Sequence, residues 1–485
     1  MFATEMKKLA LRAIDTARQQ GASYADIRII YTQHEAIETE NGEVVEVSRN
    51  ESWGFGIRVV ANGAWGFVSA NELKPEALDR AAAKAVRVAK ASSTVMREPV
   101  RLAAEPVVNT RWQTPYEIDP FRVPVEDKVR LLLDVDKILR QKPEVVRANG
   151  TMSFTKERQW MATTDGTFID QELLRSGGGY TATASGNNDT QDRSYPSGHG
   201  GNFRSAGYEF INALDFISHA AQTRDEAVAL LTAEVCPTGV KDLILEGHQL
   251  ALQIHESVGH PLELDRVLGM EASFAGRSFM TTEKLKGFEY GSSIVNLVAD
   301  TTLPGGLGTC GFDDDGVAAQ RWHVVQDGQF KAYFTNREFA HEVEESRSRG
   351  CNRTWGFGHI PIVRIPNLGL LPGEWKYEDL IRDTDDGILM ATNKSWSIDQ
   401  MRLNFQFGTE IAWEIKNGKL GKMYKNPNYQ GITPEFWRSC DAICDNDSWM
   451  LWGVHNCGKG EPMQVAEMSH ANSPARFRKV KVGIR

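Results

Sequence analysis

Helical periodicity marks several segments in the first half of the chain. Between residues 4 and 20, apolar side chains from Leu9 to Ala17 recur near the spacing of one helix face, and Gly21 follows as a stop signal. Apolar and charged residues are mixed in a comparable way in three later segments. We therefore expect helices at residues 4–20, 72–91, 126–141 and 224–233.

Extended runs alternate with these helices and are joined by tight turns. Asn41-Gly42 and Asn62-Gly63 separate three runs at residues 24–40, 43–60 and 64–70. Asn-Gly between alternating runs is typical of a hairpin, because both turn residues take positive φ. The pattern predicts an antiparallel meander, followed by a hairpin that turns at Asp165-Gly166. Residues 176–205 are rich in Gly, Ser and Asn and predict a loop or a strand with bulges.

The second half of the chain is strand-rich after residue 290. Hairpin turns are expected at Asp327-Gly328 and Asn417-Gly418, and one helix-like stretch covers residues 336–349. These patterns predict an α+β fold of two domains. Residues 1–230 would form an α+β domain around the meander, and residues 231–485 a mainly antiparallel β domain that carries one chemically distinctive helix.

Composition narrows the classes of partner. The chain has 485 residues, of which 41% are hydrophobic and 25% charged, with a formal net charge of -9. An acidic chain without a Lys/Arg block is a poor candidate for binding nucleic acid or an anionic membrane. No apolar run is long enough to span a bilayer, and the N-terminal segment lacks the core of a signal peptide. Six sparse cysteines are not a disulfide scaffold and favour the cytoplasm.

The distinctive helix contains the segment HESVGH, residues 255–260. Zinc peptidases carry His-Glu-x-x-His, in which the histidines lie about 40° apart around the helix axis. Here His255 and His260 are five residues apart, which gives about 140° on a regular helix. Gly259 and Pro261 offer two ways for the chain to bring His255 and His260 together. Gly259 can take positive φ and end the helix, so that His260 leaves the α conformation, or the last turn can widen like a π-helix.

If the two histidines do meet, they suit zinc, which prefers imidazole, thiolate and carboxylate ligands. Glu256 could then polarise a metal-bound water as the general base. Spacing does not fix the third ligand, and the candidates are Glu263, Asp265, His455 and Cys457. His455 and Cys457 lie two residues apart in the Gly-rich segment 453–462, on the same face if that segment is a strand.

Two other polar features have plainer interpretations. Asp313, Asp314 and Asp315 are consecutive, so they lack the alternation of a calcium loop. We expect them to form a solvated turn or to support the metal ligands from outside. His248, one turn before His255 in the predicted helix, is expected at the helix surface or beside the ligands.

Three segments together resemble the TldD/PmbA metallopeptidase family. They are HESVGH (residues 255–260), LGTCGFDDDGVAAQRWHVVQDGQFKAYFTNREFA (307–340) and NCGKGEPMQVAEMSHANSPARFRKVKVG (456–483). Residues 21–60 also resemble the family's first domain. The resemblance implies a zinc-dependent peptidase that cleaves peptides or unfolded segments. It assigns zinc to His255, His260 and Cys457, and the general base to Glu256.

The resemblance also implies how the protein assembles and binds its substrate. Family members work as homodimers, or as heterodimers with a homologous subunit, and the substrate is thought to lie as an added strand. Two alternatives stay open at this point. The chain could be a non-catalytic subunit that binds a homologue or peptides, or a metal-dependent amidase that acts on small substrates.

Overall fold

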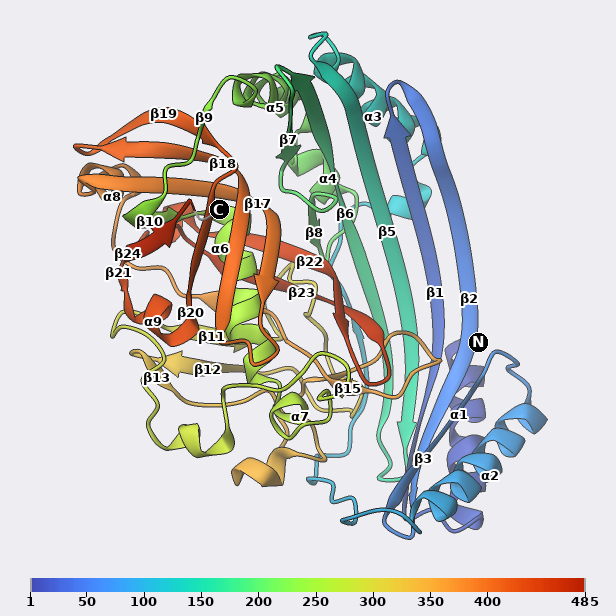
Figure 1. Ribbon diagram of the computed structural model, residues 1–485. Coiled ribbons are helices and arrows are strands. Elements are labelled where there is room, and N and C mark those ends of the chain that lie inside the picture. Colours follow the sequence, from blue (N-terminus) through green and yellow to red (C-terminus); the bar gives the residue numbers. More distant parts are fainter. Residues whose placement is uncertain (1, 484–485) are drawn as a thin grey trace.

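The computed structural model describes residues 2–483 and shows two parts that face each other (Figure 1). The N-terminal part is built on an eight-stranded sheet in the order β3-β2-β1-β5-β6-β4, with β7 and β8 also paired to β6. Its strands are β1 (Tyr24–Glu40), β2 (Glu43–Ala61), β3 (Ala64–Ala70), β4 (Asn109–Gln113), β5 (Val145–Thr163), β6 (Phe168–Gly186), β7 (Asp189–Tyr195) and β8 (Asn202–Arg204).

The meander predicted from the Asn-Gly turns is present. Strands β1, β2 and β3 pair antiparallel in sequence order. Asn41 and Asn62 both have φ of 52°, and the glycines that follow them also have positive φ. Residues 176–186 belong to β6, so the loop alternative for this region is wrong. The Gly177–Gly179 run lets Phe203 and Gly201 approach the strand closely, where a Cβ would clash with them.

Helices cover the two ends of this sheet. The first apolar core joins α1 (Phe2–Gln19) and α2 (Pro75–Ser92) to β1, β2 and β5. The second joins α3 (Val125–Leu139), α4 (Glu209–Ala213) and α5 (Phe216–Leu230) to β5 and β6. The four predicted helices are therefore confirmed, although α5 begins eight residues earlier than the pattern indicated.

The C-terminal part holds two further sheets and supports the α+β class. The larger sheet has the order β17-β10-β24-β20-β18-β19-β9, with β21 paired to β24, and the smaller has the order β13-β12-β11-β16-β23-β22. Strands of the larger sheet are β9 (Glu234–Val235), β10 (Gly239–Leu245), β17 (Asp386–Ile398), β18 (Asn404–Lys416), β19 (Lys419–Lys425), β20 (Asn428–Ile432), β21 (Cys440–Ile443) and β24 (Ala475–Val482). Strands of the smaller sheet are β11 (Leu297–Asp300), β12 (Arg321–Gln326), β13 (Gln329–Phe330), β16 (Leu368–Leu370), β22 (Met450–Lys459) and β23 (Gln464–Asn472).

Short elements complete this part. They are the strand pair β14 (Asn352–Arg353) and β15 (Ile362–Val363), and the helices α7 (Leu264–Val267), α8 (Tyr377–Arg382) and α9 (Thr433–Arg438). The predicted helix at residues 336–349 is wrong, because only a 3-10 turn at Ala340–Val343 forms there. In the described part of the chain, no helix is long and apolar enough to cross a membrane.

Helix α6 (Gly247–Ile254) packs between the two C-terminal sheets, against β17 on one side and β23 on the other. Residues 248–254 are all buried, including His248 and the two glutamines of the helix. A helix enclosed on all sides can hold its side chains in fixed positions. His248 is only 6% exposed, so of its two predicted places the helix surface is wrong, and it lies near His255, His260 and Cys457.

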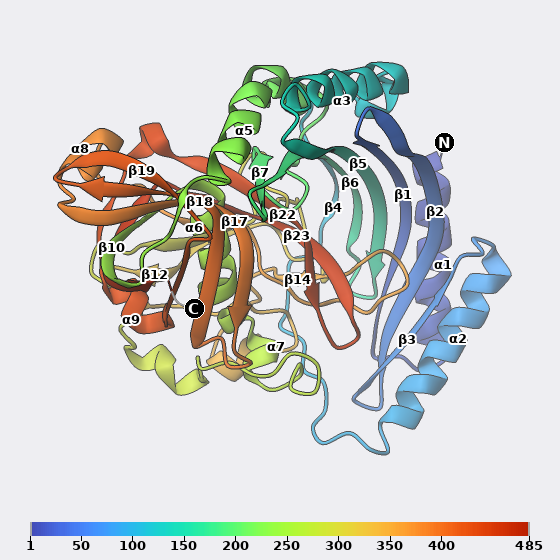
Figure 2. The same ribbon diagram turned by 45° about the horizontal axis from the view of Figure 1, so that its top comes forward.

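The β22–β23 hairpin extends from the C-terminal part toward the long N-terminal strands, as both views show (Figures 1 and 2). A cleft of about 530 Å³ lies between them. It is lined by β1, β5 and β6 on one side and by residues 307–314, 353–359 and 465–467 on the other.

The Asp313–Asp315 turn joins the two parts, which corrects the expectation of a solvated turn. All three aspartates are buried. Asp315 Oδ1 accepts a hydrogen bond of 2.7 Å from Arg58 of β2, and Asp314 Oδ1 accepts one of 2.9 Å from Gln159 of β5. The acidic run is therefore a fixed contact between the N-terminal sheet and the C-terminal part.

Candidate metal centre

A widened helical turn brings the two histidines of HESVGH to the same side of the helix. After α6, residues His255–Gly259 form a π-helical turn, and the amide of His260 donates to the carbonyl of His255. A 3-10 turn, His260–Leu262, follows. Because the π ring closes from residue i to i+5, His260 comes round to the same side of the helix as His255.

The alternative solution, a helix that ends at Gly259, is wrong. Gly259 has φ of -58° and His260 has φ of -59° and ψ of -38°, so neither leaves the right-handed helical region. Gly259 serves a different purpose. A Cβ at this position would lie 2.8 Å from Ile365 Cδ1, so glycine allows the helix to pack closely against that side chain.

Cys457 approaches from strand β22, at an irregularity in the hairpin. Val454 pairs with Met468 and Cys457 with Ala466, so β22 carries one extra residue between the two pairs. A bulge of this kind redirects the side chains beside it. The ring of His455 stacks on Phe203 at 4.1 Å between centroids, while the thiol of Cys457 points to His260.

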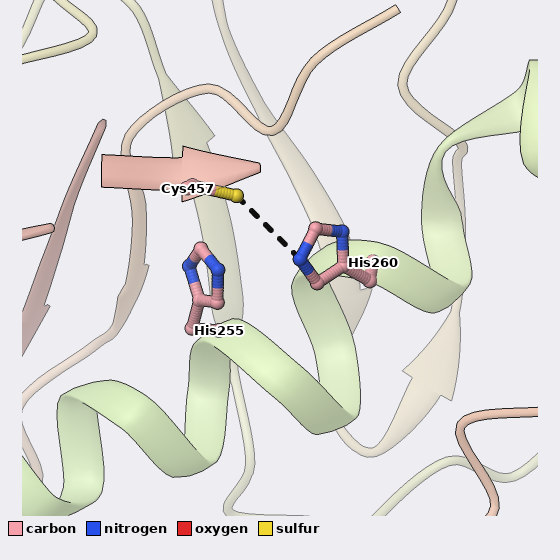
Figure 3. A group of neighbouring side chains, drawn as sticks. All are labelled: His255, His260 and Cys457. Atoms are coloured by element: carbon pink, nitrogen blue, oxygen red, sulfur yellow. Dashed lines mark hydrogen bonds between the residues drawn. The ribbon is translucent and has the colours of Figure 1, made fainter. Parts of the chain in front are cut away.

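Three potential ligand atoms thus converge inside the protein (Figure 3). Those of His255, His260 and Cys457 all lie within 4.8 Å of one another, and all three residues are buried. Cys457 Sγ is 3.5 Å from His260 Nε2. Two ligands of one tetrahedral zinc, at the usual Zn–N and Zn–S lengths, are about 3.6 Å apart, so this separation fits the ion.

Hydrogen bonds on the far side of each imidazole set its tautomer. The carbonyl of Leu368 can only accept, so His470 donates to it from Nδ1 (3.1 Å) and accepts at Nε2 from His255 Nδ1 (2.7 Å). His260 donates from Nδ1 to Glu263 Oε2 at 2.9 Å. In both histidines Nδ1 is therefore the outer nitrogen and Nε2 is the nitrogen on the side of the ion site, which is how metal-binding histidines are usually oriented.

Nearby charges favour the thiolate form of Cys457, as metal binding requires. Burial acts to raise the pKa of Cys457, but the nearby imidazoles of His255 and His260, together with Arg364, bring it well below its usual value. Burial acts to lower the pKa of His260, but Cys457 and Glu263 raise it to about 9. The thiolate is the form of cysteine that binds metals.

The other candidates for a third ligand have partners elsewhere. Glu263 accepts from His260 and lies 3.4 Å from Lys459 Nζ. Asp265 accepts from the same ammonium at 2.6 Å. His455 lines a cavity that opens beside the three converging residues, but it is not one of them. The geometry brings His255, His260 and Cys457 together and leaves these three outside.

A cavity of about 260 Å³ opens beside the three residues. Glu256, next to His255 on the π-helical turn, lines it together with Arg402. Arg402 Nη1 donates to Glu256 Oε2 at 2.8 Å. Burial acts to raise the pKa of Glu256, but the charges of His260, Arg402 and His255 lower it below the usual value. Glu256 therefore presents an ionised carboxylate to the cavity.

Three family models match the chain in sequence order. They are described as PmbA/TldA metallopeptidase domain 1 (residues 25–89), central domain (118–231) and C-terminal domain (238–482). The chain belongs to the PmbA/TldD metallopeptidase family. The resemblance noted from the sequence is confirmed, and the protein is a metallopeptidase.

Relatives of this PmbA/TldD protein share most of its length. A metalloprotease of Methanocaldococcus jannaschii is 27% identical over 466 residues, covering 95% of this chain and 97% of the relative. A metalloprotease TldD homologue of Haemophilus influenzae is 25% identical over 460 residues, covering 93% and 91%. The crystal structure of TldE from Thermococcus kodakarensis has the same fold, with a TM-score of 0.70 at 15% identity, over 99% of both chains.

Two residues of the PmbA/TldD site were missed from the sequence. Arg402 lies in the turn between β17 and β18, and His470 lies in β23, each far along the chain from the HESVGH segment. Neither stands at a motif spacing that could have revealed it. The Asp399 and Asn404 that flank Arg402 could at most have indicated a structured turn.

Proposed function

We propose that this chain is a zinc-dependent peptidase in which His255, His260 and Cys457 hold one zinc ion and Glu256 is the general base. The observation that carries the proposal is the convergence of two imidazole nitrogens and a thiolate beside a cavity lined by an ionised glutamate. Two nitrogens and one sulfur are ligands that zinc prefers, and three protein ligands leave one position open. Zinc, when bound, would polarise a carbonyl group and acidify water.

The residues of the chain account for the proton transfers of peptide hydrolysis. Glu256 would take a proton from the attacking water as the new C–O bond forms. It would then give that proton to the leaving amine as the C–N bond breaks, so that one carboxylate returns to its starting state. Arg402 donates to Oε2 of the carboxylate, so Oε1 would be the oxygen that accepts the proton.

The cleft between the two parts favours a peptide over a small amide as the substrate. His455 lines both the cavity of the three residues and the larger cleft of about 530 Å³. A chain of several residues in extended form could occupy both, and main-chain hydrogen bonding tolerates many sequences. This supports cleavage of peptides or unfolded segments.

A dimer is also part of the proposal. Exposed apolar side chains lie at or near the cavity: Trp396 (46%) lines it, Met401 (41%) precedes Arg402, and Met463 (49%) and Phe274 (48%) lie beside Gly458 and Gly460. A patch of this kind is typical of a surface covered by a partner. A second copy or a homologous subunit could cover it, and the fold shared with TldE makes a homologous subunit reasonable. The mass of the purified protein in solution distinguishes a monomer from either dimer.

The test compares the wild type with Glu256→Ala on unstructured peptides, with zinc content measured in both. We expect Glu256→Ala to keep its zinc and to lose activity by roughly 10²–10⁴-fold, as is usual for a general base. Glu283→Gln, at an exposed position, is the control and should cleave like the wild type. A Glu256→Ala protein that cleaves as fast as the wild type removes the assignment of the base. A wild type that holds zinc and cleaves no peptide supports the non-catalytic alternative.

A further inference from the structure

Arg402 occupies a backbone conformation that needs support. It has φ of 61°, a left-handed value that costs a side-chain-bearing residue about 1 kcal/mol or more. The turn is held by several hydrogen bonds. The amide of Arg402 donates to the carbonyl of Asp399, Thr433 Oγ1 donates to the carbonyl of Arg402, and the Asp399 carboxylate accepts from the amides of Leu403 and Asn404.

The same turn is tied to the segment that follows the HESVGH helix. Arg266, fully buried, donates from Nη2 to the carbonyl of Gln400 at 2.8 Å. The amide of Phe279 donates to the carbonyl of Met401 at 2.8 Å. The position of Arg402 relative to Glu256 is therefore fixed by both chain segments. A strained residue that its surroundings hold in place is a reason to look for a function.

The guanidinium has more donors than its partner uses. Within residues 2–483, its one hydrogen bond is that from Nη1 to Glu256 Oε2. Arg402 lines the cavity with Glu256, His255, His260 and Cys457, and its side chain is 15% exposed. A guanidinium presents five N–H groups in a rigid fork, so one edge can hold Glu256 while other N–H groups face a ligand.

We propose that Arg402 is a catalytic residue of this peptidase, which positions Glu256 through Nη1 and donates an N–H to the carbonyl oxygen of the scissile peptide bond. The inference rests on the proposed function. As water adds to the carbonyl carbon and Glu256 takes its proton, the C=O electron pair moves onto that oxygen. The charge of Arg402 stabilises the resulting oxyanion until the C–N bond breaks and the pair returns. A fixed donor at this position acts mainly on the transition state.

The test uses Arg402→Gln, Arg402→Lys and the exposed control Arg382→Gln, each as full-length protein with its zinc content measured. We expect Arg402→Gln to bind zinc like the wild type, to lower kcat by about 10²–10³-fold and to change KM by less than about threefold. Arg402→Lys should recover part of the loss, because it restores the charge without the fork. Arg382→Gln should behave like the wild type.

Binding of a phosphinic peptide, whose anionic oxygens imitate the oxyanion, gives a readout that does not depend on turnover. Arg402→Gln should bind it about 10²-fold more weakly than the wild type, whereas both should bind an uncleaved substrate equally in the Glu256→Ala background. Equal phosphinate affinity in wild type and Arg402→Gln overturns the assignment. So does a loss of zinc or of folding in Arg402→Lys and Arg402→Gln alike, which would show a structural role.

An arginine in a peptidase could instead bind the C-terminal carboxylate of the substrate. Peptides with free and amidated C-termini test this alternative. We expect Arg402→Gln to slow both to the same extent. If only the free acids lose affinity, Arg402 binds the terminal carboxylate of the substrate and the proposal is wrong. A wild type that cleaves no peptide at all would instead contradict the proposed function, so the two failures can be told apart.

Discussion

Two buried polar clusters, the metal centre and the Asp313–Asp315 turn, differ in what their polar atoms do. All six carboxylate oxygens of the turn accept hydrogen bonds from protein donors. In the metal centre, His470 and Glu263 hold the outer nitrogens of His255 and His260, and on the inner side His260 Nε2 is paired with Cys457 Sγ.

This difference separates a structural cluster from a functional one. Burying polar groups is costly unless they are hydrogen-bonded, and the Asp turn meets that condition with protein donors. On its inner side the metal centre meets it only through contacts among His255, His260 and Cys457 themselves. Three buried ligand atoms that have only one another as partners mark a place where an external group can bind.

The largest expected effect on zinc affinity comes from Cys457 and separates the two clusters. In Cys457→Ala a three-ligand site becomes a two-ligand site. Since zinc sites with four ligands are worth about 10–16 kcal/mol, losing one ligand should cost about 3 kcal/mol, or more than 100-fold in affinity. Competition titration with a chromophoric chelator measures this, and Asp313→Asn is the control that should bind zinc normally. Stoichiometric zinc in Cys457→Ala would assign the third ligand to another residue.

Arg58→Met should lower stability and leave zinc affinity nearly unchanged, in contrast to Cys457→Ala. Arg58 holds two buried carboxylates, with Nη2 at 2.8 Å from Asp26 and 2.7 Å from Asp315. Removing it leaves both without their cation and should destabilise the protein by about 3–5 kcal/mol, measured by urea unfolding. Zinc affinity should stay within about twofold of the wild type, because Arg58 contacts none of the three converging residues. A variant with normal stability and weakened zinc binding would contradict the contrast between the clusters.

These two clusters also show what the sequence could and could not predict. The HESVGH segment carries a local signal for His255 and His260, whereas Cys457 was one of four candidates for the third ligand until the family resemblance selected it. The turns at Asn41-Gly42 and Asn62-Gly63 likewise gave the meander. The histidine pair and the meander each depend on neighbours within a few residues.

Features that depend on distant packing were not predictable. Asp313–Asp315 looked like a solvated turn because nothing nearby indicates that Arg58 and Gln159 reach it from another sheet. The role of Gly259 was misassigned for the same reason, since Ile365 lies more than a hundred residues away. Arg402 and His470 enter the site through strand pairing that no local pattern encodes.

A smaller effect on zinc affinity is expected at His470, which tests whether the outer hydrogen bonds matter. His470→Ala leaves His255 without the acceptor that fixes its tautomer, and zinc affinity should fall about 10–100-fold. His470→Gln can accept through its carbonyl oxygen and should recover part of the loss. His323→Ala, in β12, is the control. Unchanged affinity in His470→Ala would mean that the surrounding packing alone orients His255.

The smallest effect concerns Glu157, a carboxyl group in the cleft between the two parts. Burial raises its pKa to about 7, helped by Asp314 and Glu467 and opposed by Arg175. The folded protein therefore holds this proton more tightly than the unfolded chain, so stability falls as the pH rises from about 4.5 to about 7. Glu157→Gln should gain about 1–3 kcal/mol at pH 8 and almost nothing at pH 4. An equal effect of the substitution at both pH values would contradict the raised pKa.

The most direct test of the metal centre is a crystal structure of the zinc-loaded protein with anomalous scattering measured on both sides of the zinc absorption edge. We predict one peak per chain, about 2.0–2.1 Å from Nε2 of His255 and of His260 and about 2.3 Å from Cys457 Sγ, with Glu256 beside it. A peak bound by Glu263 or Asp265 in place of Cys457, or no peak between the two histidines, would contradict the account.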